Sequence, residues 1–254
     1  MSLGLGTSLT KGGLVTPGIV TDSLVLKHNY AAGGVVPVSD GAAYFDGSDS
    51  IDLPASTNFV TGTNVTMSLW FKWGDGDDTY LFQNQKGTGQ TNIALTLNYN
   101  GSSLDGYVSL LTWNGSSHDW LTYDGSVDTS GQWHHLAGTT TSSAQVLYLD
   151  GVAVATSSNT FENTASSDLT TIGAANGGAS YQFKGYICNV GIWSEALTQA
   201  QIKSIMWKNY AGLTSSETEN LVSWWNLDEE TATDGTAGSG GVKDSHGSNH
   251  GDLE

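Results

Sequence analysis

Short segments in which apolar and polar residues alternate run through most of this chain. The clearest is Val65–Trp73, where Val65, Met67, Leu69 and Phe71 face one way and the residues between them face the other. A period of two predicts a β-strand with one face in a core. Similar segments recur between turns rich in Gly, Asp, Asn and Ser, and this spacing is typical of an all-β protein.

The strongest turn signal is Asp150-Gly151, which separates the apolar runs Gln145–Leu149 and Val152–Thr156. Asp-Gly is favoured in a two-residue hairpin because both central positions need positive φ. We therefore predict an antiparallel hairpin here. The remaining strands are predicted within Ser23–Tyr30, Ala42–Leu53 (two strands around Asp46-Gly47), Thr79–Asn84, Ile93–Asn98, Tyr107–Trp113, Asp119–Tyr123, Gln132–Thr140, Leu169–Ile172, Phe183–Trp193 and Leu221–Leu227.

One segment follows a helical period instead. Thr198 and Gln201 have the spacing of a capping box, and the apolar Ile202 and Ile205 follow at helical intervals. This pattern predicts a short helix that Gly212 can close.

The composition favours a single large β domain with a substantial core. The chain has 254 residues, of which 33 are Gly, 9 Trp and 10 Tyr. We expect an extended N-terminal arm over residues 1–21 and one domain over 22–254, with a core at 42–210 and a C-terminal strand and tail at 213–254. Cys188 is the only cysteine, so an intramolecular disulfide is impossible and we expect a buried thiol.

The charge balance excludes one class of partner. The net charge is −17, and all 8 cationic residues are Lys. Such a chain is repelled by nucleic acid and anionic lipid. No apolar run is long enough to span a membrane, and the N-terminus lacks the charged start and apolar stretch of a secretory signal. We therefore expect no nucleic-acid partner, no membrane insertion and synthesis in a cytoplasm.

Five sequence blocks in a fixed order carry a family resemblance. The stretch 42–210 resembles the laminin-G-like, concanavalin A-like lectin and glucanase family of jelly-roll sandwiches. This resemblance implies two curved antiparallel sheets, one convex and one concave. The blocks are Phe45-Asp46-Gly47, Trp133-His134-His135-Leu136-Ala137, Leu147-Tyr148-Leu149-Asp150-Gly151, Gly185-Tyr186-Ile187 with Val190-Gly191-Ile192-Trp193, and Ala196-Leu197-Thr198.

The C-terminal strand departs from the family order. The segment Leu221–Leu227 resembles the opening strand of such a domain, whereas Ser23–Tyr30 occupies the usual opening place. We predict that the two segments lie near each other and complete one sheet. The alternative is that the C-terminal strand pairs with a neighbouring subunit.

The sequence disfavours catalysis. The family's glucanases carry a strand motif resembling Glu-x-Asp-x-x-Glu, which supplies the two carboxylates of glycoside hydrolysis, and this chain lacks it. It also lacks the Gly-x-Ser-x-Gly elbow of serine hydrolases. His134 and His135 are adjacent on a strand, so they should point to opposite faces and act structurally. We predict that the protein is not an enzyme.

Two metal sites are considered, and no cofactor is required. The resemblance implies that loop carboxylates can hold a structural Ca²⁺. The alternative is that these Asp residues serve turns, where they bind nearby amides. A transition-metal site formed by His246 and His250 with Asp244 and Asp252 is the less favoured possibility, since the family has a polar loop there. The candidate calcium ligands are Asp46, Asp49, Asp52, Asn189 and Asp228.

Aromatic residues in the middle hairpins predict a sugar platform. Sugar rings stack on exposed aromatic faces, while polar side chains bind the hydroxyl groups. The alternative is that the same rings pack as cross-strand pairs inside the sandwich. The candidates are Trp113, Trp120, Tyr99, Tyr107 and Tyr123, with Asn114, His118 and Asp119 nearby.

The Gly-rich arm, the scarcity of cations and the opening Leu-Val-Leu-Lys-His-Asn-Tyr resemble structural proteins of marine tailed bacteriophages. We therefore predict a non-catalytic structural or adhesion protein of a virion surface, as a capsid decoration or a tail-fibre appendage. Its expected partners are other virion proteins or copies of itself, bound through the arm, and cell-surface glycans. The alternative is a glycan-binding lectin module of a cellular or secreted protein, located outside cells.

Overall fold

The structure is a computed structural model that describes residues 36–55, 57–74, 79–85, 90–98, 106–125, 127, 131–163, 169–229 and 241–254. The described residues all belong to one compact unit, Val35–Glu254. The predicted arm and the predicted strand Ser23–Tyr30 lie outside the described residues. Within the described ranges, no helix has the length and apolar character needed to cross a bilayer.

The regular secondary structure in the described part of Val35–Glu254 is almost wholly β-strand. One α-helix, α1 (Gln199–Ile205), and one 3₁₀ turn, η2 (Tyr210–Gly212), are the helical elements of this part. The strands are β1 (Ala43–Asp46), β2 (Ile51–Leu53), β3 (Val65–Trp73), β4 (Thr79–Gln85), β5 (Thr91–Leu97), β6 (Val108–Trp113), β7 (His118–Tyr123), β8 (Trp133–Thr140), β9 (Gln145–Leu149), β10 (Val152–Ser157), β11 (Thr170–Ile172), β12 (Lys184–Trp193), β13 (Leu221–Trp225) and β14 (Asp252–Leu253).

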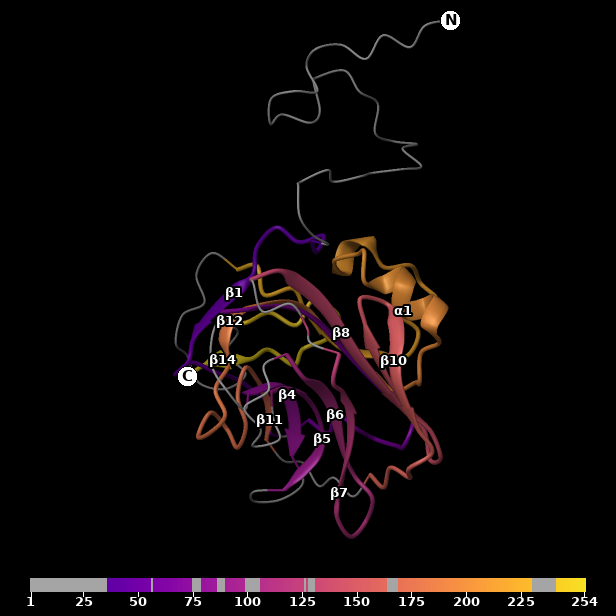
Figure 1. Cartoon of the computed structure of the whole chain (residues 1–254). Coiled ribbons are helices and arrows are strands. Elements are labelled where there is room, and N and C mark those ends of the chain that lie inside the picture. The colour runs from indigo at the N-terminus through magenta and orange to yellow at the C-terminus, as the bar shows by residue number, and fades with distance from the viewer. Residues whose placement is uncertain are drawn as a thin grey trace, which may run out of the picture. The chain divides into compact units, whose positions relative to one another are not determined.

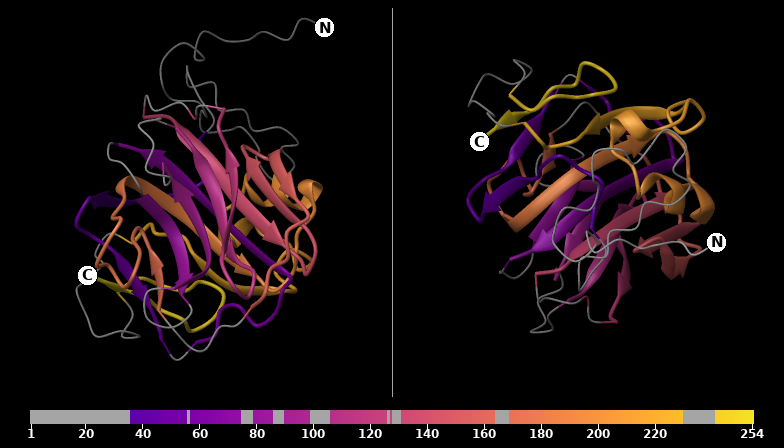
Figure 2. Two further views of the ribbon diagram at one scale, coloured as in Figure 1. Left: turned by 60° about the horizontal axis from the view of Figure 1, so that its bottom comes forward. Right: turned by 90° about the horizontal axis from the view of Figure 1, so that it is seen from above.

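The strands form two stacked antiparallel sheets (Figure 1). Sheet A has the order β1-β12-β3-β8-β9-β10, with β13 also paired to β12, and sheet B has the order β14-β2-β11-β4-β5-β6-β7. Figure 2 turns sheet B toward the viewer on the left and sheet A on the right. The predicted all-β jelly-roll sandwich is confirmed.

The core lies between the sheets and follows the alternation of the sequence. Val65, Met67, Leu69 and Phe71 of β3 all belong to the central apolar cluster, as predicted. Trp225 of β13 also lies in this cluster and packs its ring against Phe59 and Phe82. Each sheet therefore has an inner face in the core and an outer face of its own.

The Asp150-Gly151 hairpin is confirmed. Asp150 has φ 49° and Gly151 has φ 74°, so both central positions are in the left-handed region. Leu149 and Val152 are register partners on either side of the turn. The turn chemistry alone fixes this pairing because few residue pairs tolerate two positive φ angles.

The C-terminal segment completes both sheets within the same chain. β13 pairs with β12, and β14 pairs with β2. The predicted strand at Leu221–Leu227 therefore belongs to the described unit and pairs in cis. The predicted proximity to Ser23–Tyr30 concerns a segment outside the described residues.

The capping box of α1 is confirmed, but its predicted end at Gly212 is wrong. The side chains of Thr198 and Gln201 cap one another's backbone amides, and the helix ends at Met206. There the Nε1 of Trp70, a residue of sheet A, donates a 2.8 Å hydrogen bond to the Met206 carbonyl. The chain then continues to a separate 3₁₀ turn, η2, which contains Gly212.

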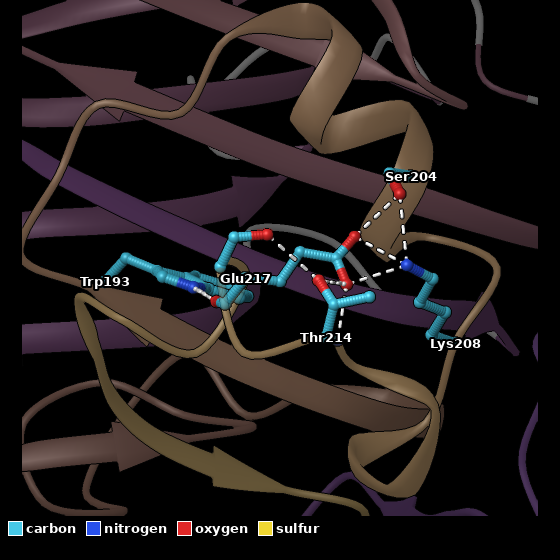
Figure 3. A network of polar contacts seen from close by, with 6 residues as sticks. Trp193, Ser204, Lys208, Thr214 and Glu217 are labelled. Carbon is cyan, nitrogen blue, oxygen red and sulfur yellow. Dashed lines mark hydrogen bonds and ion pairs between the residues drawn. The ribbon is translucent and has the colours of Figure 1, made fainter.

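α1 and the segment after it cover part of the outer face of sheet A. Figure 3 shows the hydrogen bonds through which Glu217 holds this covering segment in place. Its carboxylate accepts hydrogen bonds from Lys208 at 2.6 and 2.7 Å and from Ser204 at 2.6 Å, and its carbonyl accepts one from the Nε1 of Trp193 at 2.7 Å. The buried cluster beneath comprises Ala137, Tyr148, Trp193, Leu197, Ile202, Ile205, Leu221 and Trp224.

Candidate functional site

The predicted sugar residues lie mainly on the β6–β7 hairpin at one edge of sheet B. Trp113 and His118 are register partners, and Trp120 lies opposite Leu111. Residues two apart on a strand share a face, so Trp113, His118 and Trp120 all point away from the core. We call these three residues the β6–β7 aromatic edge.

The aromatic edge is held in place by its own contacts. The rings of Trp113 and His118 meet edge to face, with centroids 5.1 Å apart. The Nε2 of His118 lies 3.0 Å from the carbonyl oxygen of Thr91 on β5, so Nε2 donates to it in the neutral ring. Trp120 is 39% exposed. The edge therefore presents an ordered, partly open aromatic surface.

The other predicted sugar residues do not share this surface. Asp119 and Tyr123 alternate with Trp120 and lie on the inward face, and Tyr123 packs against the core. The side chain of Asn114 closes the hairpin loop, since its Oδ1 accepts from the backbone amides of Ser116 and Ser117. The predicted sugar-binding residues of this hairpin are thus divided between the outer and the inner face of sheet B.

Tyr107 is not part of the edge. It precedes β6, and its amide donates to the Oδ1 of Asn98 at 3.1 Å. Tyr99 lies outside the described residues.

A register row that the sequence reasoning missed crosses the outer face of all of sheet B. It runs through Asp252, Asp52, Thr171, Gln83, Ala94, Leu111 and Trp120. At about 4.8 Å per strand, the row is about 29 Å long. Alternation identifies which residues of each strand face outward, but strand order is needed to align them.

The middle of this row is covered by the loop Gly173–Gln182. Ala175 packs with Tyr80, Ala94 and Leu111 in one buried cluster, and the amide of Asn176 donates to Gln83 at 2.8 Å. The outer face of sheet B is therefore open at the β6–β7 aromatic edge, while its centre is buried.

The opposite end of the row carries carboxylates. Asp52 and Asp252 are register partners, and Asp252 is fully buried. Burial raises the pKa of Asp52, and the charges of Glu254 and Asp252 add to this effect, while a hydrogen bond from Thr171 opposes it. Asp52 therefore binds protons more readily than a free aspartate.

The five predicted calcium ligands do not converge. Asp46 ends β1 in sheet A, whereas Asp52 lies in β2 of sheet B. Asp46 and Asp49 bind turn groups: Asp46 accepts from Ser48 at 2.8 Å, and Asp49 accepts from the Asp46 amide at 2.8 Å. These contacts match the turn alternative.

The remaining two calcium candidates lie elsewhere in the sandwich. Asn189 forms part of a bulge with φ 51°, and its Nδ2 donates to the Val38 carbonyl at 2.9 Å. Asp228 lies against Gly41. Among the described residues, no three His, Cys, Asp or Glu side chains gather as a metal site requires. The donor set does not fit a Ca²⁺ ion.

The histidine-rich tail uses its polar groups internally. Asp244 is buried and accepts from the amides of Trp224, His246 and Asn249. The Nδ1 of His250 accepts from the Asp244 amide at 3.0 Å, and the Nδ1 of His246 lies 3.3 Å from the Tyr210 hydroxyl. The two imidazoles are thus held by different partners and are not joined in a metal site.

His134 and His135 point to opposite faces, as predicted. His134 bonds Asp150 at 2.9 Å, and the Nε2 of His135 lies 2.8 Å from the Ser68 hydroxyl. Burial lowers the pKa of His135 to about 4, against a weaker opposing effect of Asp150. Cys188 is buried on the same outer face as His135, on the other side of Trp70, and burial raises the pKa of its thiol to about 12. Neither the imidazole of His135 nor the thiol of Cys188 is accessible to a substrate.

The two sheets, their strand order and the capped helix define a concanavalin A-like jelly roll. The family model described as the concanavalin A-like lectin/glucanases superfamily matches residues 45–203, which is more than half of the chain. The chain belongs to this family. No curated protein matches the sequence significantly.

Solved structures share the fold at low sequence identity. A candidate carbohydrate binding protein from Bacteroides ovatus is 19% identical, with a TM-score of 0.60, and the match covers 84% of this chain and 57% of that one. The Ruminococcus gnavus IT-sialidase CBM40, bound to α2,3-sialyllactose, is 16% identical, with a TM-score of 0.53 and coverages of 65% and 96%.

A third neighbour has similar statistics. Domain 4 of the arabinanase AbnA from Geobacillus stearothermophilus, in complex with arabinotriose, is 23% identical, with a TM-score of 0.50 and coverages of 68% and 82%. This chain spans 57% of the Bacteroides ovatus protein. At these identities the neighbours establish the fold.

Proposed function

We propose that this chain is a non-catalytic glycan-binding module and that it binds sugar at the β6–β7 aromatic edge. The observation that carries the proposal is the exposed indole of Trp120 on the same outward face as Trp113 and His118. Sugar rings stack on such indoles through their C–H faces, and polar groups at the rim select hydroxyls.

The imidazole of His118 suits the polar part of this task. Its Nε2 donates a hydrogen bond to the Thr91 carbonyl. In the neutral ring, Nδ1 then acts as an acceptor for a sugar hydroxyl. Two of the fold neighbours were solved with arabinotriose or sialyllactose bound, and these ligands support a saccharide as the partner.

The carboxylate pair on sheet B does not suit glycoside hydrolysis. Asp252 is fully buried, so a glycosidic bond cannot reach it, and its neighbour Asp52 is half-buried and bonded to Thr171. Hydrolysis needs two carboxyl groups on either side of the scissile bond. We expect no release of reducing ends when the protein is incubated with polysaccharides.

A glycan array followed by calorimetry on its hits tests the binding proposal. Trp120→Ala should weaken binding at least tenfold, and Trp120→Phe should restore part of it, because a smaller ring still stacks. Tyr123→Phe, on the inward face of the same strand, is the matched control and should bind as the parent does. Equal affinity of the parent and Trp120→Ala would refute this site.

The finer role proposed for the protein is attachment at a virion surface, with the glycan-binding domain used for adhesion. Its support is the sequence resemblance alone, since residues 1–21 lie outside the described residues. Deleting Met1–Thr21 should abolish incorporation into particles and leave glycan binding intact. If the deletion variant is still incorporated into particles, attachment through the arm is refuted and the lectin alternative remains.

A further inference from the structure

A second aromatic surface lies on the outer face of sheet A. Tyr44, Tyr186, Lys72 and Trp133 are successive register partners across β1, β12, β3 and β8. Their chain neighbours Phe45, Ile187 and Phe71 belong to the core, so the four point outward. We call these four residues the sheet A row.

The rings of the sheet A row are in mutual contact. The ring centroids of Tyr44 and Tyr186 are 4.9 Å apart, and those of Trp133 and Tyr186 are 6.3 Å apart. Tyr44 is 53% exposed and Tyr186 is 40% exposed. The apolar cluster under α1 does not include any of the four residues. The row therefore offers a continuous aromatic surface to solvent.

The aromatic surface continues toward α1. Trp133 packs beside the buried cluster of Trp70, Cys188 and Met206. The ring of Trp207, which is 48% exposed, lies 5.9 Å from that of Trp70. Contiguous exposed aromatic side chains of this kind mark binding surfaces more often than single exposed rings do.

Lys72 gives this surface a charge preference. Its Nζ lies 5.8 Å from the centroid of the Tyr186 ring. Among the described residues, Lys72 forms no ion pair with a carboxylate. In a chain of net charge −17, Lys72 thus places an ammonium group at the centre of an aromatic row, with no carboxylate of the described residues paired to it. It attracts an anion and repels a cationic ligand such as a quaternary ammonium group.

We propose that the sheet A row is a second saccharide site, which binds an acidic glycan. Tyr44, Tyr186 and Trp133 stack on the sugar rings, and Lys72 binds the carboxylate or sulfate group. An acidic glycan suits this surface because its sugar rings can stack on the aromatic side chains. One anionic group of the glycan can then bind the single lysine of the row. The net charge makes a dense polyanion such as nucleic acid the wrong ligand. The site is independent of the β6–β7 aromatic edge and stands without it.

Calorimetry with matched ligands tests the proposal. The probes are tetragalacturonate, its neutral methyl ester and a sulfated tetrasaccharide, each titrated into the full chain. Lys72→Met keeps the length of the side chain and removes its charge, so it should weaken binding of an acidic probe at least tenfold and leave the methyl ester unchanged. Tyr186→Ala should weaken binding of both. The two acidic probes distinguish a uronate from a sulfate ester as the preferred group.

Controls separate this site from the first one. Trp120→Ala should leave binding of the acidic probe unchanged, and thermal melts should show that each variant is folded. The proposal is overturned if neither acidic probe binds, if Lys72→Met binds as the parent does, or if Trp120→Ala abolishes binding. The proposal is also overturned if the parent protein is a dimer that binds no acidic glycan and Tyr186→Ala converts it to a monomer. The sheet A row would then be a self-association surface.

Discussion

The two outer faces of the sandwich come from strands of the same alternating kind, yet they are covered differently. On sheet A, tryptophans such as Trp193 and Trp224 lie under α1 and the loop that follows it. On sheet B, amide side chains such as Gln83 and Gln85 lie under the loop Gly173–Gln182 and are satisfied by hydrogen bonds of 2.6 to 2.8 Å.

The difference shows what each cover does. Large apolar rings stabilise the fold only if they are removed from water, so sheet A depends on its cover for stability. Buried amides contribute little net stability but are costly if unpaired, so sheet B depends on the fit of its loop. Each face also leaves one aromatic surface open, the sheet A row and the β6–β7 aromatic edge. Substitutions under the covers should therefore act on stability, and substitutions on the open surfaces should act on binding.

The largest effect is expected at Trp193, beneath the cover of sheet A. Trp193→Ala should lower the free energy of unfolding by about 4 kcal/mol, because it opens a cavity and removes the donor to the Glu217 carbonyl. Denaturant unfolding followed by circular dichroism measures this change. Trp193→Phe keeps most of the ring and should cost less than half as much. Equal losses in both variants would mean that the hydrogen bond, rather than the packing, holds the cover.

A smaller effect is expected when His135 is protonated. It is fully buried on the covered face, and its pKa falls from 6.5 to about 4 in the folded protein. The unfolded chain therefore binds the proton first, and stability should fall as the pH drops from about 6.5 to about 4. The loss approaches about 3 kcal/mol, at 1.36 kcal/mol per pKa unit. Unfolding midpoints across this range measure the slope.

A variant without the titrating group provides the control for this pH effect. His135→Gln can still pair with Ser68 but cannot take up a proton near neutral pH, so its slope between pH 6.5 and 4 should be flatter. A slope as steep as that of the parent would assign the acid sensitivity to other groups.

Glu217 should contribute less to the free energy of unfolding than Trp193 or His135. Burial alone would raise the pKa of Glu217, but hydrogen bonds from Lys208, Ser204 and Thr214 outweigh it and lower the pKa from 4.5 to about 2. This stability is present above pH 4.5 and is lost as the pH falls through 2. Glu217→Gln should cost about 1–2 kcal/mol at pH 7, allowing for solvent screening. Thermal melts at pH 7 and pH 2 measure it, and the two proteins should differ less at pH 2.

Local chemistry explains which parts of the fold could be predicted from the sequence. Alternation along Val65–Trp73 and the positive φ of Asp150-Gly151 depend on neighbouring residues only, and both predictions are confirmed. The end of α1 depends on Trp70, which lies 136 residues before Met206 in the chain. No local signal reports such a contact, and the predicted end at Gly212 was wrong.

The candidate site shows the same limit. Adjacent strand residues point to opposite faces, so alternation already separates Trp120 from Asp119 and Tyr123. The sheet A row needed the register of four strands, which the sequence does not display. The calcium candidates Asp46 and Asp52 are close in the chain but belong to different sheets, because the turn between them crosses the sandwich.

The smallest effect on stability is expected at Trp120, on the open edge of sheet B. Trp120 lies opposite Leu111 and its side chain is 39% exposed, so Trp120→Ala should change the free energy of unfolding by less than about 0.5 kcal/mol. The same variant should lose the glycan affinity assigned to this edge. Denaturant unfolding of Trp120→Ala beside Trp193→Ala measures the contrast directly. A loss of several kcal/mol at Trp120 would make it a structural residue like Trp193, and the distinction between covered and open tryptophans would fail.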